Sequence, residues 1–143
     1  MRATTFGLAI LAIASSERAE AAGCAQAPQN APEIVGSYVD NFGGLQAVSN
    51  RFWISGDLVF EVCSVGDNAR HLVAYNHPAN SYNPGKFSRF EWVRAENRLW
   101  YCQTVYEAST EGAAVQAPPA DPSHPAQGGC GSSPWSTLIR ILP

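Results

Sequence analysis

Seven short segments of the chain carry the residue patterns of β-strands: polar and apolar residues alternate, or β-branched and aromatic residues are concentrated. Residues 58–65 show the alternation clearly, with Leu58, Phe60 and Val62 on one face and Val59, Glu61, Cys63 and Val65 on the other. The predicted strands are residues 34–42, 46–55, 58–65, 70–75, 86–94, 98–106 and 135–142.

Turn-forming residues separate most of these segments, as at 41–44, 55–57, 66–68 and 95–97. Strands joined by such short connections form an antiparallel meander. A strand as late as 135–142 can pair with the first strand and close the sheet, which removes both open edges. We therefore expect an all-β fold, an antiparallel meander that closes into a small barrel of about seven strands, with a β-sandwich as the alternative.

The region between the last two strands has a different character. Ser109, Thr110 and Glu111 can cap one short helix, and Pro118 and Pro119 must end it. Residues 120–134 are then a long loop rich in glycine and proline.

The N-terminal residues have the order of a secretion signal. Arg2 precedes an apolar run at 6–14, and a polar segment ends in small residues at 19–22. The apolar run is shorter than the roughly 20 residues that a spanning helix needs. We expect a signal peptide at 1–22, an extended lead-in at 23–32 and one barrel domain at 33–143, in a protein that is secreted or held in the periplasm or cell envelope. Residues 21–24 also have the form of a lipobox, so the alternative is a lipoprotein anchored through Cys24.

Four cysteines form an even set in such an exported chain. Three pairings are possible, and we favour Cys24 with Cys63 and Cys102 with Cys130. The spacings match neither C-x-x-C nor a Cys/His metal pattern. We therefore expect structural disulfides and no metal or other cofactor.

Gly36-Ser37-Tyr38, at the head of the first strand, and Arg140, near the end of the last, resemble the lipocalin pattern. In that family a late arginine covers the aromatic residue of a G-x-W motif at the barrel floor. The resemblance implies a barrel-floor pair of Tyr38 and Arg140 in a small calycin-type barrel. Tyr38 stands where the family has tryptophan, and the family has eight strands. Residues 36–44 and 100–103 are also similar to parts of exported bacterial proteins, a likeness that implies no activity.

Charge and polar residues exclude several functions. The net charge is −3 and Lys86 is the single lysine, so the basic surface required for nucleic-acid binding is missing. His77 and His124 lie beside prolines in loops, and His71 begins a strand with no carboxylate at ligand spacing, so we expect all three to be exposed. No nucleophile motif with an identifiable base occurs, so we predict no catalytic residues and rank a hydrolase-type enzyme third.

Aromatic residues give the main functional signal. Adjacent pairs such as Phe52 with Trp53 cannot both point inward, so some rings lie on the outer face, under the lead-in or under residues 107–134. Our first hypothesis is a binding module for an apolar or amphipathic small molecule at the barrel mouth, with Phe60, Phe90 and Trp92 as lining candidates. The second is an extracellular or envelope interaction protein that uses an exposed aromatic surface.

Overall fold

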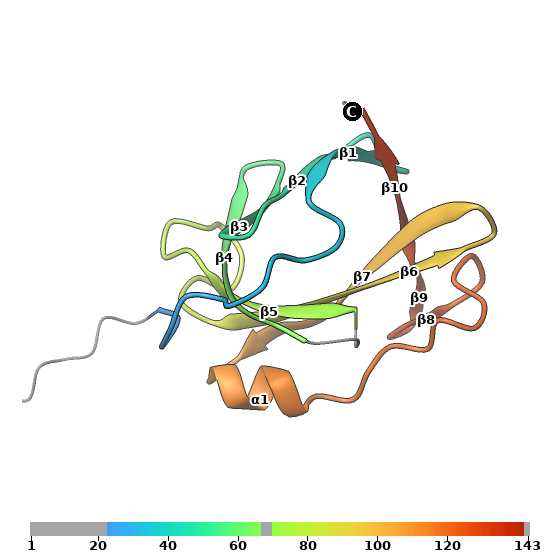
Figure 1. Ribbon diagram of the computed structural model, residues 1–143. Helices are drawn as coiled ribbons and strands as arrows, with labels where there is room; N and C mark the ends of the chain where they lie inside the picture. Colours follow the sequence, from blue (N-terminus) through green and yellow to red (C-terminus); the bar gives the residue numbers. More distant parts are fainter. Residues whose placement is uncertain (1–22, 67–69, 142–143) are drawn as a thin grey trace, which may run out of the picture.

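The computed structural model describes residues 23–66 and 70–141, and its main feature is a closed antiparallel barrel of eight strands (Figure 1). Neighbours around the barrel follow the order β1-β10-β7-β6-β5-β4-β3-β2. The barrel strands are β1 (Gly36–Asp40), β2 (Leu45–Val48), β3 (Phe52–Ser55), β4 (Leu58–Val65), β5 (His71–Asn76), β6 (Phe87–Ala95), β7 (Arg98–Ala108) and β10 (Ser136–Arg140). The predicted meander and its closure by the last strand are confirmed, and the sheet is a barrel, not a sandwich.

The barrel has eight strands where about seven were predicted. The segment 46–55 is two strands, because residues 49–51 turn the chain between β2 and β3. The Ser49 hydroxyl accepts the backbone N–H groups of Arg51 (3.2 Å) and Phe52 (2.9 Å) and thereby replaces the missing ladder hydrogen bonds. The turn contains no glycine or proline, which is why the pattern concealed it.

The segment between β7 and β10, residues 109–135, is here called the excursion, and it contains the expected helix. The helix α1 (Glu111–Gln116) begins after Thr110, whose side chain accepts the N–H of Ala113. A two-residue hairpin follows, formed by β8 (Gly129–Cys130) and β9 (Ser133–Pro134). An added Cβ at Gly129 would lie 2.0 Å from the Asp121 carbonyl oxygen, so the loop can fold back on itself only with glycine there.

A bulge in β4 changes the expected faces of that strand. The register with β5 shifts between Val62 and Ser64. Phe60 and Val62 are buried in the core as predicted, but after the bulge Val65 also packs against the core instead of facing outward.

Residues 23–35, which comprise the predicted lead-in and the segment that joins it to β1, cover one end of the barrel, here called the floor. Cys24 is disulfide-bonded to Cys63 on β4, and Ile34 is completely buried in the core. Glu33 accepts a hydrogen bond from the Trp92 indole (3.1 Å). The opposite end, where the loop from β5 to β6 lies, is the mouth.

The disulfides bear on where the protein resides. Both predicted pairs, Cys24–Cys63 and Cys102–Cys130, are formed. Disulfides are typical of extracellular or periplasmic proteins. The lipoprotein alternative is overturned, because the sulfur atom that would carry the lipid is bonded to Cys63. The predicted signal peptide at 1–22 lies outside the described residues.

Candidate functional site at the β7–β10 seam

The candidate site lies where β10 pairs with β7, here called the β7–β10 seam. β7 has 11 residues, but its register with β10 covers only Tyr101, Trp100 and Leu99. On its other side β10 pairs with β1 as far as Arg140. The seam is therefore short, and a pocket lies beyond each of its ends: one toward the mouth and one toward the floor.

The mouth pocket has a volume of about 430 Å³, within the range of small-molecule sites. Four aromatic side chains and several hydroxyl and amide groups line it. Phe42 (83% exposed) and Tyr106 (52% exposed) stand at its rim, whereas Trp135 is buried. The remaining lining residues are Asn41, Tyr101, Cys102, Gln103, Cys130, Ser133, Pro134 and Ser136. This mixture of rings and hydrogen-bonding groups suits an amphipathic molecule.

A buried polar network lies behind this pocket, inside the barrel. The Asp40 carboxylate accepts the backbone N–H groups of Phe42 (2.9 Å) and Gly44 (2.8 Å) and the amide of Gln46 (3.0 Å). Gln46 in turn accepts the indole N–H of Trp53 (2.9 Å). These bonds satisfy a buried carboxylate and fix the turn that carries the Phe42 ring.

Tyr101 connects this network to the pocket, because its side chain both lines the pocket and faces Asp40. Its hydroxyl donates to Asp40 Oδ2 at 3.4 Å. Burial, and next the negative charge of Asp40, raise the pKa of Tyr101 well above the ordinary value for tyrosine. The hydroxyl is therefore a neutral group at physiological pH.

The Cys102–Cys130 disulfide contributes both of its cysteines to the pocket wall. It belongs to a second apolar cluster outside the barrel, with Trp100 and Trp135. The Trp135 indole donates to the Asp121 carbonyl oxygen (3.0 Å). The excursion thus covers these two tryptophans, as the adjacent aromatic residues in the sequence indicated.

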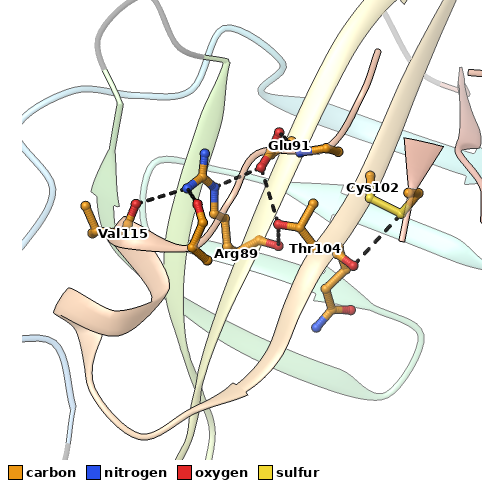
Figure 2. A network of polar contacts seen from close by, with 9 residues as sticks. Arg89, Glu91, Cys102, Thr104 and Val115 are labelled. Carbon is orange, nitrogen blue, oxygen red and sulfur yellow. Dashed lines mark hydrogen bonds and ion pairs between the residues drawn. A yellow bond between two sulfur atoms is a disulfide. The ribbon is translucent and has the colours of Figure 1, made fainter. Parts of the chain in front are cut away.

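An ion pair on the outer side of β6 ties the excursion to the barrel (Figure 2). Arg89 Nε lies 2.9 Å from Glu91 Oε1, with a direction that suits an ion pair better than a hydrogen bond. Arg89 also donates to the carbonyl oxygens of Val115 (3.0 Å) and Ala117 (2.8 Å), and Glu91 accepts the N–H of Ala120 (3.1 Å). Arg89 thus holds the end of α1, and Glu91 holds the segment that follows it.

The three predicted lining residues lie in the barrel core. Phe90 stacks on Trp53 with ring centroids 4.4 Å apart and meets Phe60 edge-on at 5.0 Å. Trp92 is buried with them, although it also borders a depression shared with Glu33 and Arg70. None of the three lines the mouth pocket.

The residues of the mouth pocket were not predicted from the sequence, because the alternation of polar and apolar residues does not show where two strands stop pairing. The signal available was Trp100-Tyr101-Cys102-Gln103, in which Tyr101 and Gln103 share a face.

The barrel-floor pair of Tyr38 and Arg140 is in contact. The guanidinium carbon of Arg140 lies 5.1 Å from the centre of the Tyr38 ring, and Nη2 donates to the tyrosine hydroxyl (2.9 Å) and the Val35 carbonyl oxygen (3.1 Å). An added Cβ at Gly36 would lie 2.7 Å from Nη1. Glycine two residues before the aromatic ring thus leaves room for the arginine.

Metal ligands, acid pairs and membrane-spanning helices are the other features that could indicate a function. Within residues 23–66 and 70–141, no group of three or more His, Cys, Asp or Glu residues could hold a metal ion. Asp40 faces the barrel interior, whereas Glu91 lies on the outer side of β6 with Arg89. In the same part of the chain, no helix is long and apolar enough to cross a membrane.

An exposed apolar face lies on the outer side of β10, β1, β2 and β3. Val39 is opposite both Ile139 on β10 and Leu45 on β2, and Ala47 is opposite Ile54 on β3. Ile139 and Leu45 are each 60% exposed. This outer face is aliphatic rather than aromatic along most of its length.

Searches of protein-family models, curated proteins and solved structures give no match to this chain.

Proposed function

We propose that the protein is an exported β-barrel binding module that holds a small amphipathic molecule in the mouth pocket. The observation that carries this proposal is the pocket itself. It combines exposed rings with hydrogen-bonding groups beyond the mouth end of the β7–β10 register. The Tyr38–Arg140 contact and the eight strands support the likeness to calycin-type barrels.

The pocket is preorganised for such a ligand. The disulfide fixes one wall, and the hydrogen bonds to Asp40 fix the turn that bears Phe42. Binding therefore requires little ordering of the backbone, which reduces its entropic cost. The rings of Phe42 and Tyr106 would cover the apolar part of the ligand, and Gln103 and Ser136 would bond its polar part.

The test is a titration with N-phenyl-1-naphthylamine, a neutral fluorescent probe that carries a phenyl group, a naphthyl group and one N–H. We expect the Tyr106→Ser variant to bind it about tenfold more weakly, equivalent to roughly 1.4 kcal/mol of lost contact. Tyr82→Ser is the matched control, because Tyr82 is 72% exposed and outside the lining of the mouth pocket. Equal affinity of both variants and the parent protein would refute the site.

A second candidate is an interaction protein, favoured by the exposed apolar face on β10, β1, β2 and β3. Its partner would be an extracellular or envelope protein that presents an apolar surface. This function predicts that Leu45→Ser/Ile139→Ser abolishes association with that partner and leaves probe binding unchanged. Tyr106→Ser should have the opposite pattern, so the two functions can be separated.

A further inference from the structure

The floor pocket, beyond the other end of the β7–β10 seam, has a different chemistry from the mouth pocket. Its volume is about 450 Å³. Three arginines line it, Arg94, Arg98 and Arg140, together with the polar residues Asn97 and Thr137. Tyr38, Leu99, Leu138 and Ile139 supply its apolar lining.

The strand register places two of these arginines, Arg94 and Arg140, on the inner face of the sheet. Arg94 lies opposite Leu99, and Leu99 lies opposite Leu138, so all three positions are on the same face of the sheet. That face is the inner one, since Leu99 and Leu138 belong to the core. Arg140 faces inward too, because it lies opposite the buried Tyr38. Two inward positions at the floor rim therefore bear guanidinium groups above apolar residues.

Among the described residues, no carboxylate lies within ion-pair distance of these guanidinium groups. Among the described residues, the ion pairs within 4.0 Å join Arg70 to Glu33 and Arg89 to Glu91. Glu96 is in the β6–β7 turn beside this pocket but does not come within that distance of Arg94 or Arg98. Three positive charges thus gather at one pocket of a chain whose net charge is −3.

One of the three is already held in place. Arg140 donates to Tyr38 and Val35 through Nη2 and lies over the Tyr38 ring, and Nη1 takes no part in either hydrogen bond. Guanidinium groups bind phosphate and carboxylate oxygens through strong charge-assisted hydrogen bonds. The apolar residues around them can take a hydrocarbon chain attached to the same anion.

We propose that the floor pocket is a second binding site, for an anionic amphiphile: a phosphate or carboxylate group joined to an apolar chain. Arg94 and Arg98 bind the anion from the β6–β7 hairpin, and Arg140 binds it from β10. Leu99, Leu138 and Ile139 contact the chain. The site is separate from the mouth pocket, with which it shares no lining residue.

The experiment is a calorimetric titration with monomeric dodecyl phosphate, below its micelle concentration, in low salt. The Arg94→Gln/Arg98→Gln variant should lose affinity by tenfold or more, because each charge-assisted hydrogen bond is worth about a factor of ten. Arg51→Gln/Lys86→Gln is the control, with the same change in net charge at two exposed positions outside this pocket. It should bind like the parent protein.

Titrations with three further ligands test the charge, the apolar chain and the source of the anion. Dodecyl maltoside should bind at least tenfold more weakly than dodecyl phosphate, since it lacks the charge. Inorganic phosphate that binds as tightly as dodecyl phosphate would overturn the role of the apolar chain. Vesicles of phosphatidylglycerol that bind the parent and the control, but not Arg94→Gln/Arg98→Gln, would assign the anion to a membrane lipid.

Equal binding of dodecyl phosphate by both double variants would overturn the site. The Tyr106→Ser protein should bind dodecyl phosphate normally, so failure of the mouth pocket and failure of the floor pocket can be told apart. Far-UV circular dichroism of each variant verifies that the barrel is folded.

Discussion

At the scale of single residues, this barrel depends on polar side chains in places where the sequence suggested only strands. Nothing in the sequence pattern marks a partner for Asp40, yet the structure surrounds its carboxylate with donors from Phe42, Gly44 and Gln46. Alternation predicts that Asp40 and Tyr38 share a face, but it cannot show that Gln46 and Tyr101 reach the same point from other strands. Tyr38 and Arg140 were found because a family resemblance, not their spacing, linked two positions about 100 residues apart.

The raised pKa of Tyr101 predicts how the stability of the protein changes at alkaline pH, and this tests the contact of Tyr101 with Asp40. Its folded pKa is raised, so the folded protein retains the proton that the unfolded chain releases above about pH 10. The stabilisation is complete below that pH and is lost as the pH rises toward the folded pKa. We expect the free energy of unfolding to fall more steeply between pH 9 and about pH 11 in the parent protein than in Tyr101→Phe. Urea unfolding at several pH values measures this, and parallel curves for the two proteins would contradict it.

The ion pair of Arg89 and Glu91 gives a second test at this scale. Both side chains are 8% exposed, so Arg89→Met leaves a buried carboxylate without its counter-charge. Loss of one partner in such a pair costs about 3–5 kcal/mol of unfolding free energy. Arg89→Met/Glu91→Leu should recover part of that loss, and chemical denaturation measures both. A loss below about 1 kcal/mol in the single variant would show that the pair is solvated.

At the scale of elements, sequence patterns were most informative for long strands and least informative at turns and bulges. The β6 and β7 segments are well predicted, because Ser88, Phe90 and Trp92 alternate with residues that face outward. The bulge in β4 could not be predicted, since one extra residue leaves the local composition unchanged and only reverses the faces that follow. The helix α1 was predictable from Thr110 and the prolines beyond it.

Removal of the Cys102–Cys130 disulfide should destabilise the protein and loosen the excursion. The bond spans a sequence separation of 28 residues, and the chain-entropy model assigns such a loop about 3.5 kcal/mol of unfolding free energy as an upper value. We expect Cys102→Ala/Cys130→Ala to be destabilised by up to that amount. It should also be cleaved faster within residues 117–134 under limited proteolysis.

Cys24→Ala/Cys63→Ala is the matched control for proteolysis, because that bond holds the lead-in to β4 and not the excursion. Cleavage at the same rate in both double variants would mean that Arg89, Glu91 and the buried tryptophans hold the excursion without the disulfide. A single Cys130→Ala variant should in addition expose one reactive thiol at Cys102.

At the scale of the whole molecule, a closed barrel was predictable and the position of its openings was not. Closure follows from a late strand that pairs with the first one, and β10 does so. The two pockets arise because β10 is short and meets β7 over three residue pairs, a property of two strands about 30 residues apart. The interior aromatics, expected at a ligand, pack against one another and fill the core. The aliphatic outer face is likewise a product of four strands placed side by side.

Native mass spectrometry can show whether the protein binds a small amphipathic molecule in the mouth pocket. The parent protein, titrated with N-phenyl-1-naphthylamine, should show a saturable complex with one probe molecule. Tyr106→Ser should need about tenfold more probe to reach the same fraction bound, whereas Tyr82→Ser should match the parent. If the parent protein forms no complex, or if Tyr106→Ser forms it at the same probe concentration, the mouth pocket is not the binding site.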